Sequence, residues 1–397
     1  MSTSAEIEAV SATRTKRRAL ARVSPLASVA ATLACGALLL PPAVSHVDQP
    51  SITAEPACPD VEVVFARGTA EPPGAAQMKA AVVKALGTPP VYADFPDPQD
   101  RDGAVVATVE AAALKNLDRV MVSGKHYSGA HLPLPMVAGV DGVARLDDGR
   151  LVYANARPPY GMMAEKTLIN PAAAIEVPEG IEPVLAAAVP NPALSVWLSF
   201  EHRARIRPGQ HVLVLGATGV TGSLAVQLAK AAFGAGRVVA AGRNEARLEW
   251  LQKMGADDVI NLGTDDLGPR VAAEHRAQPF DVVLDYLWGT PAEQVLAALG
   301  NASFHVTRFV QIGDMAGPDV TLPAGILRSA GIELVGMGFG SVPAEALTRA
   351  AVDHLPRLLE MVAGGELHLQ TQRQPLSRVE DLWTGREASG SRVVLVP

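Results

Sequence analysis

Three glycines within residues 216–222 form the segment of this sequence with the clearest chemistry. The run Gly216-Ala-Thr-Gly-Val-Thr-Gly222 follows an apolar stretch, 211–215, and precedes residues 223–230, whose apolar side chains recur at helical spacing. Glycine lets the backbone turn tightly and approach an anion, and a helix N-terminus offers free N–H groups to that anion. An ordinary strand-to-helix turn is the alternative. The pattern predicts a pyrophosphate site made by Gly216, Ala217, Thr218, Gly219, Val220 and Gly222.

Two arginines follow the next apolar stretch, 237–242. Arg243, Asn244 and Arg247 come directly after its last residue. A residue at this place meets the adenosine ribose of a bound dinucleotide, and NAD-preferring sites carry Asp or Glu there. Guanidinium groups suit a 2′-phosphate, because they bind it through paired donors. The sequence therefore predicts NADPH as the cofactor. Two solvated surface arginines are the alternative, and Glu245 is near enough to reach the ribose.

Alternating elements must position this turn. The chain around it has the pattern of a parallel sheet wrapped by helices. Buried strands are expected at 211–217, 237–242, 280–285, 308–313 and 332–336, and helices near 290–299, 322–330 and 343–363.

The first 77 residues differ from the rest. Residues 14–22 are basic and residues 25–45 are uncharged, which is the order of a secretory signal and a length that permits one membrane span. An alanine-rich flexible tail is the alternative. Residues 58–74 resemble the mature N-terminus of actinobacterial cutinases, but no serine in the chain stands in the G-x-S-x-G pattern of their nucleophile. We expect a signal-like or disordered leader over 1–57 and a cutinase-like fragment with a linker over 58–77.

Residues 78–397 resemble the medium-chain dehydrogenase/reductase superfamily, and most closely its zinc-free quinone oxidoreductase branch. The resemblance implies an α/β fold in which a Rossmann doubly wound parallel sheet, 201–364, is inserted into a GroES-like, partly open β-barrel, 78–200 plus 365–397. It also implies an active site between the two and a homodimer through the Rossmann sheet. The segments that carry it, besides the glycine turn, are 111–118, Ser123-Gly124, 139–142, 186–197, 255–257 and 390–397.

The same resemblance implies that no metal takes part. Val140 and Asp141 stand where zinc-dependent members carry a His-Glu pair, and residues 78–397 contain no cysteine. The mechanism that remains is direct hydride transfer from NADPH to an electron-poor acceptor such as a quinone or an enone. Lys115 stands where relatives often have Asn, which leaves the source of the proton open. Asp118 is expected to be a structural hydrogen-bond partner.

Further site residues also come from the resemblance. Ser195 is expected beside the nicotinamide and Tyr127 beside the substrate. The alternatives are a helix-surface serine and a barrel-lining tyrosine. Asp285, Gly313 and Arg392 complete the residues that we expect to bind the cofactor.

Composition excludes one class of partner and leaves two other functions open. Lys and Arg number 34 against 41 Asp and Glu, a formal net charge of -7, which argues against nucleic-acid binding. Membrane contact is expected only if the apolar leader is used, and a cytoplasmic location is expected because NADPH is found there. The alternatives are a serine esterase, as the N-terminus suggests, and a non-catalytic NADPH-binding protein.

Overall fold

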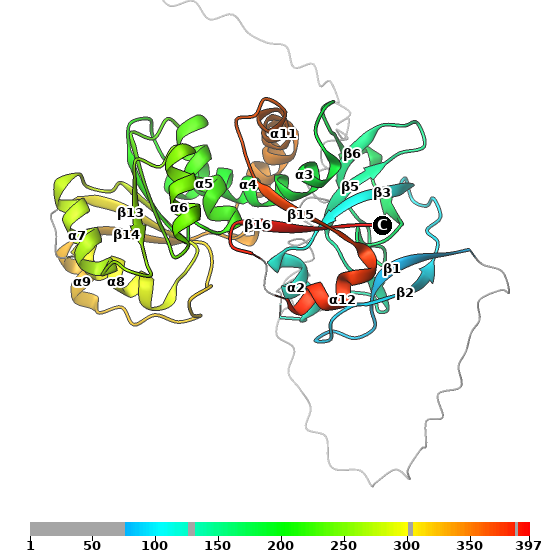
Figure 1. The fold of residues 1–397 in the computed structure, drawn as a ribbon, viewed down its shortest axis with the longest axis horizontal. Helices are drawn as coiled ribbons and strands as arrows, with labels where there is room; N and C mark the ends of the chain where they lie inside the picture. Colours follow the sequence, from blue (N-terminus) through cyan, green and yellow to red (C-terminus); the bar gives the residue numbers. More distant parts are fainter. Residues whose placement is uncertain (1–75, 126–131, 301–304, 386–387) are drawn as a thin grey trace, which may run out of the picture.

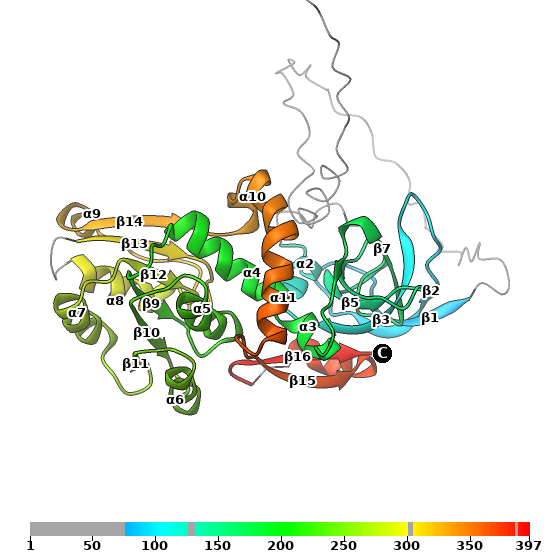
Figure 2. The same ribbon diagram turned by 90° about the horizontal axis from the view of Figure 1, so that it is seen from above.

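The computed structural model describes residues 76–125, 132–300, 305–385 and 388–397. The leader, the cutinase-like fragment and Tyr127 lie outside these residues. Two lobes lie side by side, and helices α4 (Pro190–Leu198) and α11 (Leu355–Ala363) pack against each other between them (Figures 1 and 2). One cluster of buried side chains draws on both lobes, so they share part of their core.

A six-stranded parallel sheet forms the first lobe, in the order β11-β10-β9-β12-β13-β14. The chain starts at the centre with β9, moves outward to β11 and returns to β12 on the other side. The strand order therefore reverses between β9 and β12, and ligands bind open α/β sheets at such a reversal. The strands are β9 (His211–Leu215), β10 (Arg237–Gly242), β11 (Asp258–Asn261), β12 (Val282–Asp285), β13 (Val306–Gln311) and β14 (Gly331–Gly336).

Helices cover both faces of this sheet, which explains its continuous apolar strands. Val212 and Val214 pack with α5 and α6, whereas Leu213 and Leu215 pack with α7 and α8. Both sides of β9 are therefore buried, as in other parallel sheets. The helices of the lobe are α5 (Val220–Ala231), α6 (Glu245–Lys253), α7 (Leu267–Ala277), α8 (Gly289–Gly300) and α9 (Ala324–Ser329).

Two strands depart from the sequence-based expectation. β11 was not predicted, because Asp258 and Asn261 leave only two apolar residues between them. The prediction that 332–336 is a buried strand is wrong. β14 is the edge strand of the sheet, and the side chain of Leu334 is 37% exposed.

The second lobe consists of two antiparallel-rich sheets that form the open barrel. One has the order β2-β1-β4, and the other has the order β15-β16-β3-β5-β6-β8, with β7 paired to β3. The C-terminal strand β16 (Ser391–Val396) pairs with β3 (Val105–Ala113), so the end of the chain returns to the barrel lobe. The other strands are β1 (Gln77–Val83), β2 (Val91–Pro96), β4 (Met136–Val137), β5 (Asp141–Arg145), β6 (Leu151–Asn155), β7 (Lys166–Ile169), β8 (Ile175–Glu176) and β15 (Gln370–Pro375).

Shorter helices connect the lobes and close the barrel. They are α2 (Asn116–Val122), α3 (Pro183–Ala188), α10 (Ala344–Arg349) and α12 (Val379–Thr384). The helical stretch Pro183–Ala204 is long and apolar enough to cross a membrane, but 78% of its apolar window is buried inside the protein. Its hydrophobicity is therefore explained by its place in the shared core.

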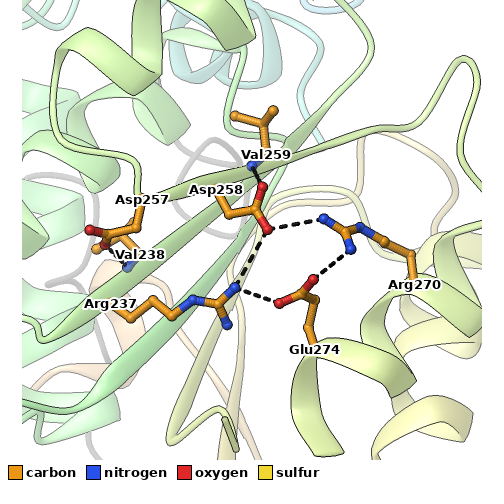
Figure 3. Close-up of polar contacts among 7 residues, drawn as sticks. All are labelled: Arg237, Val238, Asp257, Asp258, Val259, Arg270 and Glu274. Atoms are coloured by element: carbon orange, nitrogen blue, oxygen red, sulfur yellow. Dashed lines mark hydrogen bonds and ion pairs between the residues drawn. The ribbon is translucent and has the colours of Figure 1, made fainter. Parts of the chain in front are cut away.

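An ion-pair network lies at the end of the sheet where β10 and β11 begin (Figure 3). Arg237 contacts the carboxylates of Asp258 and Glu274. Arg270 Nη2 lies 3.0 Å from Asp258 Oδ2, and its Nη1 lies 2.6 Å from Glu274 Oε1. Each arginine therefore has two carboxylate partners, and the network joins α7 to the edge of the sheet.

Candidate cofactor and acceptor site

The glycine turn lies at the end of β9, beside the reversal of strand order. Gly216 has a φ of +82°, and a Cβ on Gly222 would lie 2.3 Å from the carbonyl oxygen of Gly216. Only glycine fits these positions. A Cβ on Gly219 would meet one atom, Gly216 O, at 3.3 Å, so the outer side of the turn is open. Helix α5 begins here, and no side chain of the described residues caps it. The turn thus fits the expected pyrophosphate, whose oxygens would accept hydrogen bonds from the free N–H groups.

The end of β10 packs directly on this turn. A Cβ on Gly242 would lie 2.4 Å from Thr218 Cγ2, so a side chain at 242 would displace Thr218. From the other lobe, Ser389 Oγ donates a hydrogen bond of 3.1 Å to Thr218 O. The sequence gives no indication of the contact between Ser389 and Thr218, because 171 residues separate them and neither lies in a motif that predicts it.

The two arginines after β10 occupy different environments. Arg243 is exposed, whereas the side chain of Arg247 is 6% exposed and lies 4.0 Å over the ring of Trp250. Asn244 precedes α6 and accepts from Arg247 N at 3.0 Å, so its amide oxygen caps the helix. The sequence emphasised Arg243, but the structure makes Arg247 the stronger candidate for binding an anion.

Arg247 is a buried cation without an acceptor. None of its three side-chain nitrogens has a hydrogen-bond partner in the described part of the chain, and burial lowers the pKa of its guanidinium. Gly390, at a φ of +72°, lies so close that its Cβ would be 2.4 Å from Arg247 Nε. A buried charge without a partner costs several kcal/mol, so such a group indicates a missing anion. A 2′-phosphate fits it.

Asp285 and Gly313 shape the loop next to the glycine turn. Asp285 ends β12 fully buried and accepts from Leu287 N at 2.8 Å and Trp288 N at 3.1 Å. Burial raises the pKa of Asp285 to about 6, against the effect of these N–H donors. A Cβ on Gly313 would lie 2.7 Å from Tyr286 O, which leaves room only for glycine.

The remaining predicted residues lie in other elements. Ser195 is half-buried in α4, and its carbonyl accepts from Ser199 Oγ at 2.7 Å. Arg392 lies in β16, and its Nη1 donates to Leu114 O of the barrel lobe at 2.9 Å. The structure therefore gathers the glycine turn, Asn244 and Arg247 at the C-terminal ends of β9 and β10, whereas Arg392 bonds to Leu114 of the barrel lobe.

A cavity lined from both lobes could receive an acceptor. Its volume is about 130 Å³, close to the apolar cavity of about 150 Å³ that binds benzene in an engineered protein. One flat ring is therefore of the right size. Most of the wall is apolar, including Met136, Leu194, Phe339 and Leu355, and the polar groups are Asp118, Asp141, Tyr153, Asn155 and Asn191.

A buried lysine lies behind the polar part of this wall. Lys115 is 2% exposed, and its Nζ lies 3.4 Å from Asp118 Oδ2 and 3.3 Å from Asp141 Oδ1. Burial alone would lower the pKa of Lys115, but the two carboxylates outweigh it and raise that pKa. Asp118 accepts from Lys115 N at 2.9 Å and from Val140 N at 3.0 Å, the structural contacts expected of it. Over the described ranges, no group of three or more His, Cys, Asp or Glu side chains is arranged to hold a metal ion.

Comparisons with known proteins agree on one family. The model of the zinc-binding dehydrogenase family matches residues 220–355. The quinone oxidoreductase of Thermus thermophilus, solved alone and with NADPH, is 30% identical with a TM-score of 0.66, over 81% of this chain and 100% of that one. A protein of Emericella nidulans, named a probable NADPH-dependent quinone reductase, is 26% identical over 81% of this chain and 100% of its own length. An NADPH-dependent alkenal/one oxidoreductase of Arabidopsis thaliana is 30% identical over 47% of this chain and 51% of its own.

Proposed function

Because the chain belongs to the medium-chain dehydrogenase/reductase superfamily, in its quinone oxidoreductase branch, we propose that it is an NADPH-dependent reductase of quinones, enones or similar electron-poor carbonyl compounds. The observation that carries the proposal is the guanidinium of Arg247, which is buried and has no hydrogen-bond acceptor among the described residues. It lies at the C-terminal end of the sheet, as does the open glycine turn. Together they provide for the two anionic parts of NADPH.

The chain's own groups divide the work of holding the cofactor. The N-terminal N–H groups of α5 would bind the pyrophosphate, and Arg247 would bind the 2′-phosphate, with Arg243 nearby at the surface. Ser389 holds the C-terminal segment against Thr218, so the barrel lobe would help to enclose the bound cofactor. When bound, NADPH supplies a hydride from its nicotinamide ring.

The cavity between the lobes supports a flat, apolar acceptor. Its aliphatic and aromatic wall would exclude water and orient one ring, which is what hydride transfer requires of the protein. The names of two relatives, a probable quinone reductase and an alkenal/one oxidoreductase, refer to electron-poor carbonyl compounds. Measuring NADPH absorbance with a panel of quinones, enones and aldehydes tests the proposal. No turnover of any acceptor would contradict it.

We propose further that the reaction needs no metal. The ammonium of Lys115 lies between the carboxyl groups of Asp118 and Asp141, where a metal cation bound by this pair would have to lie. Activity should survive dialysis against a chelator. Bound zinc in stoichiometric amount, lost together with the activity, would contradict this proposal.

A homodimer is also proposed, paired through the edge of the parallel sheet. Among the described strands β14 has a neighbour on one side only, and no side chain of α9, which packs on it, is fully buried. Leu334 is 37% and Val306 is 52% exposed there. A second copy would cover this edge and its apolar side chains. Sedimentation should give a dimer that Leu334→Lys dissociates, and a monomeric wild-type protein would contradict the proposal.

The working location is proposed to be the cytoplasm. The dependence on NADPH supports this proposal, because an exported enzyme would have no supply of NADPH. Fractionation of the producing cell should find the protein with the soluble cell contents, and most of it outside the cell would contradict this.

A further inference from the structure

Asp141 contributes a buried carboxyl group to the wall of the acceptor cavity. Its side chain is 1% exposed, and its Oδ1 lies 3.3 Å from the ammonium nitrogen of Lys115. Its Oδ2 accepts a long bond, 3.3 Å, from Asn191 Nδ2, and the hydroxyl of Tyr153 also bonds the carboxyl group. Both oxygens of Asp118, the other carboxyl on this wall, accept backbone N–H groups. Among the described residues, no backbone N–H binds Asp141, so it is the carboxyl group of this wall that is held by side chains alone.

The burial of Asp141 favours a carboxyl group that holds a proton. Burial, the largest effect, raises the pKa of Asp141, and the charge of Asp118 acts in the same direction. The ammonium of Lys115 and the hydroxyl of Tyr153 oppose this rise. The positive charge of Arg392 in turn lowers the pKa of Lys115. Once the proton has left, the same ammonium, 3.3 Å away, stabilises the carboxylate.

We propose that Asp141 donates the proton that completes reduction of the acceptor, and that Lys115 is the positioning residue that stabilises the resulting carboxylate. The inference rests on the proposed function. The transferred hydride forms the new C–H bond and leaves an electron pair on the acceptor oxygen. As the Asp141 O–H bond breaks, that oxygen takes the proton and an enol forms, which becomes the ketone in water. A proton from water restores the acid.

The proposal predicts a difference between two acceptors. An enolate is a strong base and needs a donor in the transition state, whereas the hydroquinone anion is stable enough to be protonated by water. Asp141→Asn should lower kcat for 2-cyclohexen-1-one by about 10²- to 10⁴-fold, the usual contribution of a general acid. The kcat for 1,4-naphthoquinone should fall less than tenfold.

The pH dependence separates this role from a merely structural one. Because the protonated acid is required, wild-type kcat for the enone should fall as pH rises through the pKa of Asp141. The Asp141→Asn variant should lack this fall. Asp148→Asn, which removes an exposed carboxylate from the same β5–β6 hairpin, is the matched control and should behave as wild type. Equal losses for both acceptors with an unchanged pH profile would overturn the proposal.

Two measurements keep the test independent of how well the variant folds. Wild-type turnover of the enone should show a solvent deuterium isotope effect that turnover of the quinone lacks. The infrared spectrum of the cofactor-free protein should contain a protonated-carboxyl band, which Asp141→Asn removes. Absence of both signals would overturn the inference while the reductase activity stands. No wild-type turnover of any acceptor would instead overturn the proposed function, and this inference with it.

Discussion

Arg237 and Arg247 lie at opposite ends of the same stretch of chain, and their surroundings contrast. Arg237, where β10 begins, contacts two carboxylates, which Arg270 contacts in turn (Figure 3). Arg247, in the first turn of the helix that follows β10, is buried and has no acceptor among the described residues. The charge of Arg237 is balanced by carboxylates of the chain, whereas the charge of Arg247 is balanced only when an anion is added. A buried guanidinium without a carboxylate partner therefore marks the ligand site, whereas charge by itself does not.

The largest effect should come from the turn that both cofactors share. Gly219→Asp places a carboxylate where the pyrophosphate is expected to bind, and like charges repel. We expect the KM values for NADPH and NADH both to rise by at least about 100-fold, or about 3 kcal/mol. Steady-state kinetics with one acceptor checks this. A variant with near-normal KM values would show that the open side of this turn is not the anion site.

Removing Arg247 should separate the two cofactors. A charge-assisted hydrogen bond contributes about 1.5–3 kcal/mol, so Arg247→Met should raise the KM for NADPH by about 10- to 150-fold and leave that for NADH nearly unchanged. The melting temperature of the cofactor-free protein should hold or rise, because a buried unpaired charge is lost. Arg247→Lys should recover part of the preference. Equal effects on both cofactors would contradict the assignment.

Gly390 tests whether the placement of Arg247 matters as well as its charge. A methyl group at 390 would overlap Arg247, and the φ of +72° disfavours any side chain by about 1–2 kcal/mol. Gly390→Ala should weaken NADPH binding by less than Arg247→Met does, with a lowered melting temperature. Gly365→Ala is the control, because Gly365 has a φ of +72° and no atom close to its Cβ. It should lower stability only, and an equal loss of NADPH binding would remove the role given to Gly390.

The smallest effect is expected at the paired arginine. Arg237→Met removes contacts that are partly exposed, and such ion pairs contribute at most about 1 kcal/mol. The free energy of unfolding in urea should fall by about this amount, and the KM for NADPH should not change. Weakened NADPH binding in this variant would break the contrast between the two arginines.

Much of the parallel sheet could be predicted from sequence, because buried strands there are continuous apolar runs. The extents of β10 and the glycine turn were correct for this reason. β11 has too few apolar residues to be recognised, and the exposure of β14 depends on which strand lies last in the sheet. Local pattern contains neither piece of information.

The site was predicted less completely than the fold. Spacing placed Arg243 and Arg247 after the strand, but only packing shows that Arg247 is the buried one. Contacts between distant segments, such as Ser389 with Thr218 or Lys115 with Asp141, have no local signature. Residues at positions known from the family could be named from the sequence. Their contact partners could be identified only in the folded structure.

Binding of two nucleotide fragments directly tests whether Arg247 binds the 2′-phosphate, because neither hydride transfer nor the acceptor takes part in it. Calorimetry should compare 2′,5′-ADP with 5′-AMP on the wild-type protein and on Arg247→Met. We predict that the wild-type protein binds 2′,5′-ADP at least about tenfold more tightly than 5′-AMP, or by about 1.4 kcal/mol, and that the variant loses this difference. Equal affinity of the wild-type protein for the two fragments would contradict it.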